Sequence, residues 1–218
     1  MKKPDITKII QILSRETKKF ITPIVTDISK ATQSPSRVLI SCILSLRTKD
    51  LTTKGASQRL FKLADNPYDM LNLTTKRIEK AIFPVGFYRV KARNILSICC
   101  DLVNKFNGRV PDDLDTLLTL KGVGRKTANL VLTEGFNKLG VCVDTHVHRI
   151  SNRLGFVKTY SPLETEMALR KKLPKKFWKE YNTLLVTWGQ NICKPVTALC
   201  SICRINKLCL RISVVKSK

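Results

Sequence analysis

Four cysteines near the C-terminus have a spacing that suits a metal centre. They follow the pattern C-x6-C-x2-C-x5-C and are Cys193, Cys200, Cys203 and Cys209. Thiolates bind transition metals, and without a secretory signal a disulfide framework is the weaker interpretation of such a group. The remaining four of the eight cysteines lie among apolar residues and are expected to be buried. These are Cys42, Cys99, Cys100 and Cys142.

A short glycine turn is the second place where the residue types suggest chemistry. Gly122 and Gly124 lie between two apparent helices, and Lys121, Arg125 and Lys126 surround them with positive charge. Glycine adopts backbone angles closed to other residues and leaves room for a close ligand. Amide hydrogens at a helix N-terminus bind anions. A nucleic-acid phosphate is one interpretation, and an ordinary αα-hairpin with a tight turn is the other.

The charge balance favours a polyanionic partner. Forty Lys and Arg against sixteen Asp and Glu give a net charge of +24, far more than solubility requires. A lysine-rich surface of the thermophile kind would add glutamate in parallel, whereas from residue 168 to 218 the only carboxylate side chain is Glu180. Phosphate backbones fit this surface better than an anionic membrane, for which we find no anchor.

The elements that must position these groups are predicted to be helical throughout. Ser34-Pro35 is a helix start, and the segment from Val38 to Leu46 is apolar almost all round, which indicates a central core helix. Asn107-Gly108 is a helix stop, and Ser161 with Glu164 forms a capping box. Because no alternating strand of useful length is present, we expect an all-α protein of roughly ten helices.

Composition and the N-terminus bear on the protein's location. Hydrophobic residues make up 43% of the 218 residues, enough for a substantial core. No apolar run approaches the roughly 20 residues of a membrane helix, and polar residues interrupt the stretch after the basic N-terminus. We expect an intracellular protein without a membrane partner, in the cytoplasm or nucleoid if the source is prokaryotic, and a monomer.

Three motifs in order resemble the endonuclease III family of helix-hairpin-helix DNA glycosylases with lyase activity. The first is the segment Gly122-Val123-Gly124-Arg125-Lys126-Thr127-Ala128-Asn129. The second is Val143-Asp144-Thr145-His146-Val147 with Arg149, and the third is the group of four cysteines. The resemblance covers nearly the whole chain, from Ser36 to Cys209, and the three motifs together are far more specific than any one of them.

The resemblance implies a fold and a partner. It implies two α-helical domains with a DNA cleft between them, and duplex DNA with damaged bases or abasic sites as the partner. Residues 27–137 would form a six-helix domain with the helix-hairpin-helix motif. Residues 1–26 together with 138–218 would form the iron-sulfur cluster domain.

Two residues match the family's catalytic groups. Lys126 matches the nucleophile, whose amine attacks the sugar and forms a Schiff base that permits β-elimination. Asp144 matches the carboxylate that stabilises positive charge on the sugar. Lys126 has a second interpretation as one more phosphate-contacting lysine. Asp144 directly precedes a helix, so it is also a candidate N-cap, and both of its roles are compatible.

The resemblance also implies a set of DNA-binding residues. They are Lys121, Gly122, Val123, Gly124, Arg125, Arg47, Phe87, His146, Lys194 and Arg204. Arg47 and Phe87 would fill the gap left by the flipped base. Arg47 departs from the bacterial pattern, which has glutamine there, and Lys121 departs from the frequent proline. Phe87 is alternatively a core aromatic, and His146 a lone helix-surface or core histidine.

For the four cysteines the resemblance implies a [4Fe-4S] cluster. Zinc is the competing ligand, although zinc sites more often show two C-x2-C pairs and this chain has one. The family activity that follows is removal of oxidised pyrimidines with strand cleavage 3′ to the abasic site. A relative that removes another lesion or a mismatched base, and a non-catalytic DNA-binding module, are the alternatives.

Overall fold

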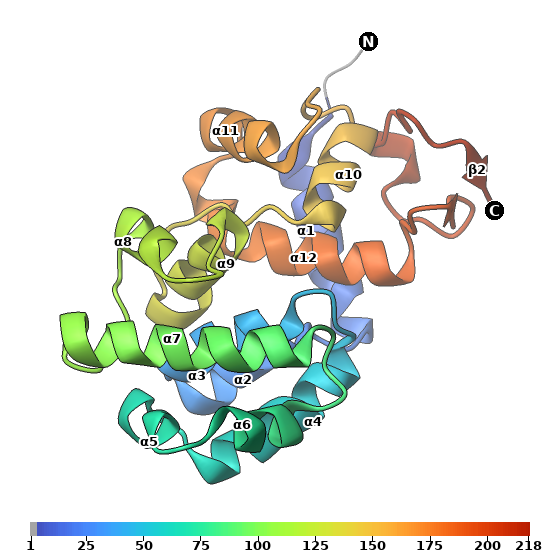
Figure 1. The fold of residues 1–218 in the computed structure, drawn as a ribbon. Coiled ribbons are helices and arrows are strands. Elements are labelled where there is room, and N and C mark those ends of the chain that lie inside the picture. The colour runs from blue at the N-terminus through green and yellow to red at the C-terminus, as the bar shows by residue number, and fades with distance from the viewer. Residues whose placement is uncertain (1–3) are drawn as a thin grey trace. The chain divides into compact units, whose positions relative to one another are not determined.

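The computed structural model describes residues 4–218, and these divide into two compact units. One unit is the continuous segment 24–138, and the other combines residues up to 23 with residues 139–218. Figure 1 follows the chain through twelve labelled α-helices and one pair of two-residue strands. The all-α prediction is confirmed, and in the described part no α-helix is long and apolar enough to cross a membrane.

The unit 24–138 contains eight α-helices and a short π-helix. They are α2 (Ile24–Thr32), α3 (Pro35–Ser45), α4 (Asp50–Leu63), α5 (Pro67–Leu71), α6 (Thr75–Ile82), α7 (Tyr88–Phe106), α8 (Leu114–Thr119), α9 (Arg125–Leu130) and the π-helix η2 (Val131–Gly135). Helix α3 is buried from Val38 to Leu44, as its apolar sequence predicts. Ser34 caps α3 by accepting a hydrogen bond from the Arg37 amide, and Pro35 occupies its first turn.

Helix α2 was not anticipated from the sequence. Its buried residues are confined to the first turn, Ile24, Val25 and Thr26, so the periodic apolar signal is short. Tertiary contacts stabilise the helix instead: the Thr26 hydroxyl donates to the Glu134 carboxylate, and the Ser29 hydroxyl donates to the Glu134 carbonyl oxygen. Both partners lie more than a hundred residues further along the chain, where local sequence reasoning does not reach.

The second unit is built from both ends of the chain. Its elements are α1 (Ile6–Glu16), the 3-10 turn η1 (Thr17–Lys19), α10 (Thr145–Arg153), α11 (Pro162–Lys172), η3 (Lys175–Phe177), α12 (Trp178–Asn191), β1 (Thr197–Ala198), η4 (Asn206–Leu208) and β2 (Lys216–Ser217). Ile9 and Leu13 of α1 join Val147 of α10 and Leu185 of α12 in one buried core. The strands β1 and β2 pair in parallel.

Local signals read from the sequence set several boundaries. Asn107 and Gly108 both have left-handed backbone angles after α7, and the Gly108 amide donates to the Leu102 carbonyl oxygen at 2.8 Å. Ser161 accepts from the Glu164 amide at the start of α11, and the Glu164 carboxylate reaches back to the Tyr160 amide. The predicted stop and the predicted capping box are therefore both confirmed.

Candidate functional site

The glycine turn joins α8 to α9, and its two glycines serve different purposes. Gly122 has φ +80°, and a Cβ at this position would lie 2.7 Å from Asn94 Nδ2 of α7. Gly124 has φ −97°, an angle open to any residue, and an added Cβ would meet no protein atom within 4 Å. The expectation of special backbone angles holds for Gly122 alone. Gly124 leaves the outer face of the turn open to an external group.

Lys126 is the second residue of α9 and is half-buried. No side chain caps this helix at Gly124, and the basic residues Lys121, Arg125 and Lys126 lie within four residues of Gly124 in the sequence. The Lys126 ammonium lies near the buried thiol of Cys42 in α3, where it partly opposes the effect of burial, which raises the pKa of Cys42 to about 12. Lys126 is thus half-buried, with its ammonium near a core residue of α3 and its backbone in the first turn of α9.

Asp144 is the N-cap of α10. One carboxylate oxygen accepts hydrogen bonds of 2.9 Å from the amides of both His146 and Val147. The carboxylate is half-buried and is held by these amides in one orientation. The capping interpretation of Asp144 is confirmed, and because one oxygen makes both bonds, it is compatible with a second role. Lys126 and Asp144 lie in different units.

His146 follows the cap and is half-buried on α10. Its Nδ1 lies 3.2 Å from a guanidinium nitrogen of Arg149, and an added Cβ at Gly189 of α12 would lie 2.4 Å from the same Nδ1. His148, which carried no expectation, instead bonds the hydroxyl of Thr165 at 2.7 Å. The two histidines of the chain therefore face different surroundings.

Arg47 and Phe87 lie on two neighbouring loops of the unit 24–138. Both are exposed, both have left-handed backbone angles, and the Arg47 guanidinium lies 5.6 Å from the centre of the Phe87 ring. Phe87 is 61% exposed, so its interpretation as a core aromatic is wrong. Two large side chains held together at the surface in uncommon backbone conformations indicate a function outside the core.

A buried lysine joins these two loops, and sequence reasoning overlooked it. Lys91 of α7 is 5% exposed, and its ammonium donates to the carbonyl oxygens of Leu44 and Leu46 and to the Thr48 hydroxyl. Thr48 in turn accepts from the Gly86 amide at 3.2 Å. Burial lowers the pKa of Lys91 to about 8, yet three oxygen acceptors suit an ammonium.

The signal for Lys91 was present in the sequence. Lys91 occupies the same helical stripe as Ile95, Ile98 and Leu102, where a charged residue is unexpected. The two loops also pack closely against each other, since a Cβ at Gly86 would lie 2.7 Å from the carbonyl oxygen of Arg47. The loop of Arg47 and the loop of Phe87 are thus held at a fixed separation.

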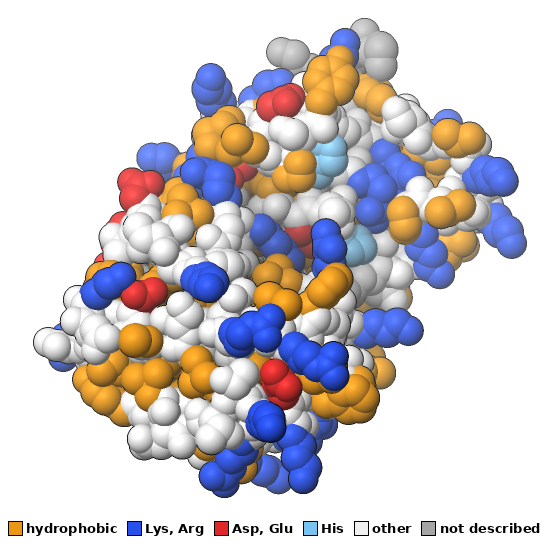
Figure 2. All heavy atoms as spheres, viewed as in Figure 1, with side chains coloured by type: hydrophobic (Ala, Val, Ile, Leu, Met, Phe, Trp, Pro, Cys, Tyr) orange, Lys and Arg blue, Asp and Glu red, His pale blue; other side chains and the backbone are white. Residues whose placement is uncertain are grey.

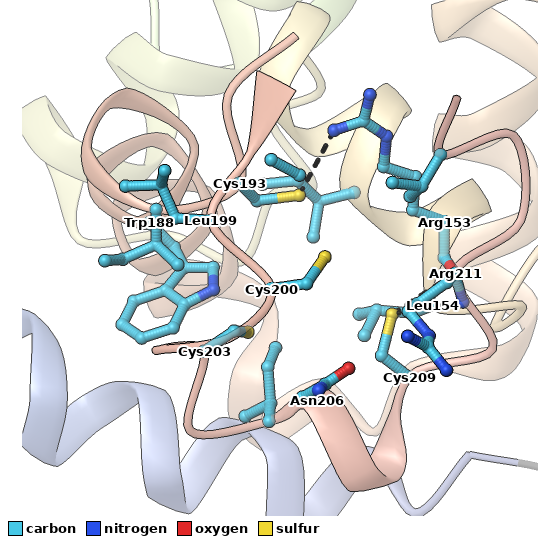
Figure 3. A pocket seen from close by; sticks show the side chains of 15 residues that line it. Arg153, Leu154, Trp188, Cys193, Leu199, Cys200, Cys203, Asn206, Cys209 and Arg211 are labelled. Atoms are coloured by element: carbon cyan, nitrogen blue, oxygen red, sulfur yellow. Dashed lines mark hydrogen bonds between the residues drawn. The ribbon is translucent and has the colours of Figure 1, made fainter. Parts of the chain in front are cut away.

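The four C-terminal cysteines line one pocket of the second unit (Figure 3). The pocket is lined mostly by apolar side chains, including Ile150, Leu154 and Trp188. Burial raises the pKa of Cys203 to about 11 and raises that of Cys209. No three metal-ligating side chains of residues 4–218 converge on a single point as one ion would require.

Donors approach two of the sulfur atoms in this pocket. Arg153 is 6% exposed, and its guanidinium donates to the Cys193 sulfur at 3.4 Å. The Arg211 amide donates to the Cys209 sulfur at 3.4 Å. The residues present fit a thiolate-held iron-sulfur group, because four cysteines line one pocket and four thiolates complete the ligands of such a group, while N–H donors to sulfur tune it.

Positive charge is abundant on the molecular surface. On the face drawn in Figure 2, Lys and Arg side chains are numerous and carboxylates are few. Lys121 beside the glycine turn is exposed, as are Lys194 and Arg204 beside the cysteine pocket. These residues are accessible to a polyanion, as the net charge predicts.

The arrangement of helices and the glycine turn agree with known proteins. Residues 40–175 match the family described as HhH-GPD superfamily base excision DNA repair protein. The chain is 50% identical over 175 residues to Endonuclease III of Thermotoga maritima. The aligned residues cover 80% of this chain and 82% of that protein.

Two solved structures have a fold similar to that of this chain. A non-covalent Endonuclease III–DNA complex has a TM-score of 0.81 and 36% identity, covering 93% of this chain and 94% of that chain. A trapped Endonuclease III–DNA covalent intermediate, an estranged-adenine complex, has a TM-score of 0.77 and 39% identity, covering 81% and 83%. The fold and the turn thus define a helix-hairpin-helix protein of the glycosylase superfamily. Within it, the chain belongs to the endonuclease III family.

Replacing Lys91 by methionine tests the joint between the two loops. Met has a similar length but no donor, so the buried carbonyl oxygens of Leu44 and Leu46 lose their partner. Leaving a buried acceptor unsatisfied costs about 1–3 kcal/mol, and we expect the free energy of unfolding in urea to fall by about that amount. The exposed Lys80 of α6 provides the control: Lys80→Met should change stability by less than about 0.5 kcal/mol. Equal stability of the two variants would contradict the assignment.

Proposed function

We propose that this protein is a base-excision-repair DNA glycosylase and abasic-site lyase that removes oxidised pyrimidines from duplex DNA. The observation that carries the proposal is the position of Lys126, two residues after Gly124 of the open glycine turn. The fold of the chain also matches that of a trapped covalent Endonuclease III–DNA intermediate. Phosphate binding alone requires neither a half-buried lysine at this point nor the capped carboxylate of Asp144.

The chemistry assigned to Lys126 balances in three steps. Its unprotonated amine attacks the sugar carbon that bears the damaged base, forming a C–N bond as the bond to the base breaks and the base leaves with that electron pair and a proton. Opening of the sugar ring then gives an imine, and the remaining proton of the amine passes to the ring oxygen. A base removes a proton from the neighbouring sugar carbon, and the bond to the 3′ phosphate breaks by β-elimination. After these three steps, water hydrolyses the imine and releases Lys126.

Asp144 acts where positive charge develops on the sugar. A fixed anion stabilises that charge without reorganising during the reaction, and the two amides that hold its carboxylate supply this rigidity. The carboxylate is also available to accept the proton that the amine releases. Lys126 belongs to the unit 24–138, and Asp144 belongs to the unit that combines residues up to 23 with residues 139–218.

The glycine turn and its neighbours would hold the DNA backbone. Gly122, Val123 and Gly124 present main chain to a phosphate, with Lys121 and Arg125 supplying charge. Arg47 and Phe87 would enter the gap left by the flipped base, and the guanidinium of Arg47 has donors for the orphaned partner base. His146 would lie near the base pocket, and Lys194 and Arg204 would face DNA from the cysteine-rich segment.

A [4Fe-4S] cluster is the proposed occupant of the cysteine pocket, held by Cys193, Cys200, Cys203 and Cys209. A single zinc ion with sulfur ligands at about 2.3 Å would require the four sulfurs to meet at one point, whereas here they surround a cavity. When bound, the cluster supplies four metal–thiolate links that order the segment after α12. The segment then presents its basic residues to DNA.

Lys126→Gln separates covalent chemistry from binding. Glutamine keeps a similar length but has no amine, so borohydride trapping on lesion-containing duplex should vanish and strand cleavage should fall by orders of magnitude. DNA affinity should persist, because one charge among forty is a small loss. Efficient trapping by this variant would show that another amine performs the reaction.

Asp144→Asn separates the charge of the carboxylate from its cap. Asparagine is an equally good N-cap, so thermal stability should be nearly unchanged while base release in single-turnover assays falls by about 10²–10³, the range for loss of one transition-state interaction. Retention of full activity would remove Asp144 from catalysis.

Gly124→Val tests the open face of the turn. The position has room for a side chain and an extended backbone, so the variant should fold normally. The valine would obstruct a phosphate, and affinity for duplex DNA of any sequence should therefore fall together with the steepness of its salt dependence. Gly55→Val, in α4 outside the hairpin, is the control. Unchanged binding by folded Gly124→Val would contradict the phosphate site.

A further inference from the structure

The indole N–H of Trp188 is a buried donor with no protein acceptor. Trp188 lies on α12 and is 2% exposed, and its Nε1 has no hydrogen-bond partner among residues 4–218. Buried tryptophan N–H groups normally find an acceptor, because leaving one unsatisfied costs about 1–3 kcal/mol. An unsatisfied donor in an otherwise well-packed core indicates that a bound group supplies the missing hydrogen-bond acceptor.

The indole nitrogen faces the cysteine pocket. Trp188 lines that pocket together with the four cysteines, and Figure 3 shows its nitrogen on the side where Cys200 and Cys203 lie. The indole lies close enough to Cys203 to favour its thiolate, although burial outweighs this and leaves the pKa of Cys203 raised. The Cys203 thiol nevertheless does not complete a hydrogen bond of good geometry to the indole.

Packing holds the ring in this orientation. The Phe20 ring meets Trp188 edge-on, with centroids 6.4 Å apart and an interplanar angle of 70°. Trp188 also belongs to the buried core that joins α1, α10 and α12. The polar edge of the indole is therefore fixed toward the pocket by apolar contacts on its other sides.

We propose that Trp188 donates its indole N–H to a sulfur atom of the bound cluster, on the side held by Cys203. This inference rests on the cluster assigned above. Cluster sulfurs and their thiolates are anionic acceptors, and donors to them favour the more negative, reduced state. Trp188 would thus raise the reduction potential of the cluster in addition to packing beside it. Arg153 makes a comparable approach to Cys193 on another side of the pocket.

The chain provides a matched control. Trp178 is the other of its two tryptophans, and its indole N–H donates to the Leu173 carbonyl oxygen at 2.9 Å. Trp178 does not line the pocket. A change from tryptophan to phenylalanine therefore removes the same group at both positions, and only one of them faces the cysteines.

The experiment uses the full chain, prepared without oxygen and labelled with ¹⁵N in its indoles. The thermally populated paramagnetic states of a [4Fe-4S] cluster displace the resonances of nearby nuclei. We expect a displaced indole N–H signal that Trp188→Phe removes and Trp178→Phe does not. Trp188→Phe should also shift the reduction equilibrium about tenfold toward the oxidised cluster, equivalent to 59 mV for one electron, with Trp178→Phe unchanged.

The outcomes distinguish the two proposals. Absence of iron, or zinc in its place, would overturn the cluster and with it the proposal for Trp188. About four irons per chain, with an undisplaced Trp188 signal or an unchanged potential in Trp188→Phe, would overturn only the hydrogen bond. If Trp188→Phe fails to fold, the wild-type and Trp178→Phe spectra decide, because Trp178→Phe retains a single indole whose position must be displaced.

Discussion

The close approach of the glycine turn to α7 is the constraint on which the arrangement of the hairpin depends. Gly122 packs against the side chain of Asn94 and has φ +80°, and this left-handed angle, which favours glycine, turns the chain between α8 and α9. Because Lys126 is only four residues further on, its position follows from that turn. The neighbouring Gly124 is unconstrained by the protein, so the same turn is tightly packed on one face and open on the other.

Several groups at the candidate site also hold the fold together. Asp144 caps α10 with the carboxylate that we propose for catalysis. Lys91 donates to carbonyl oxygens at the end of α3 and joins the two loops that carry Arg47 and Phe87. Hydrogen bonds that are needed for stability keep these groups in one geometry. Preorganisation of this kind lowers the reorganisation that a reaction or a binding event requires.

The segment after α12 depends on a different principle. From Ile192 to the C-terminus it contains only two-residue strands and a 3-10 turn, too little regular structure to be stable alone. Its order comes from packing of Ile205 and Ala198 and from the guanidinium of Arg153, which donates to the carbonyl oxygens of Lys194 and Pro195. Thiolate ligation of a cluster would add covalent links to these contacts.

The sequence by itself determined the all-α class, the capped starts of α3 and α11, the end of α7 and the family motifs, because these are encoded by residues within one or two turns of each other. Only the tertiary structure decided what depends on distant contacts. Helix α2 is stabilised by Glu134, the Lys91 ammonium finds its acceptors more than forty residues earlier, and Phe87 lies at the surface although its sequence suits a core equally well. In the sequence, Trp188 looks like an ordinary apolar residue of α12. Only the fold brings its indole into the pocket that the four cysteines line, because that pocket is formed by segments that meet after folding.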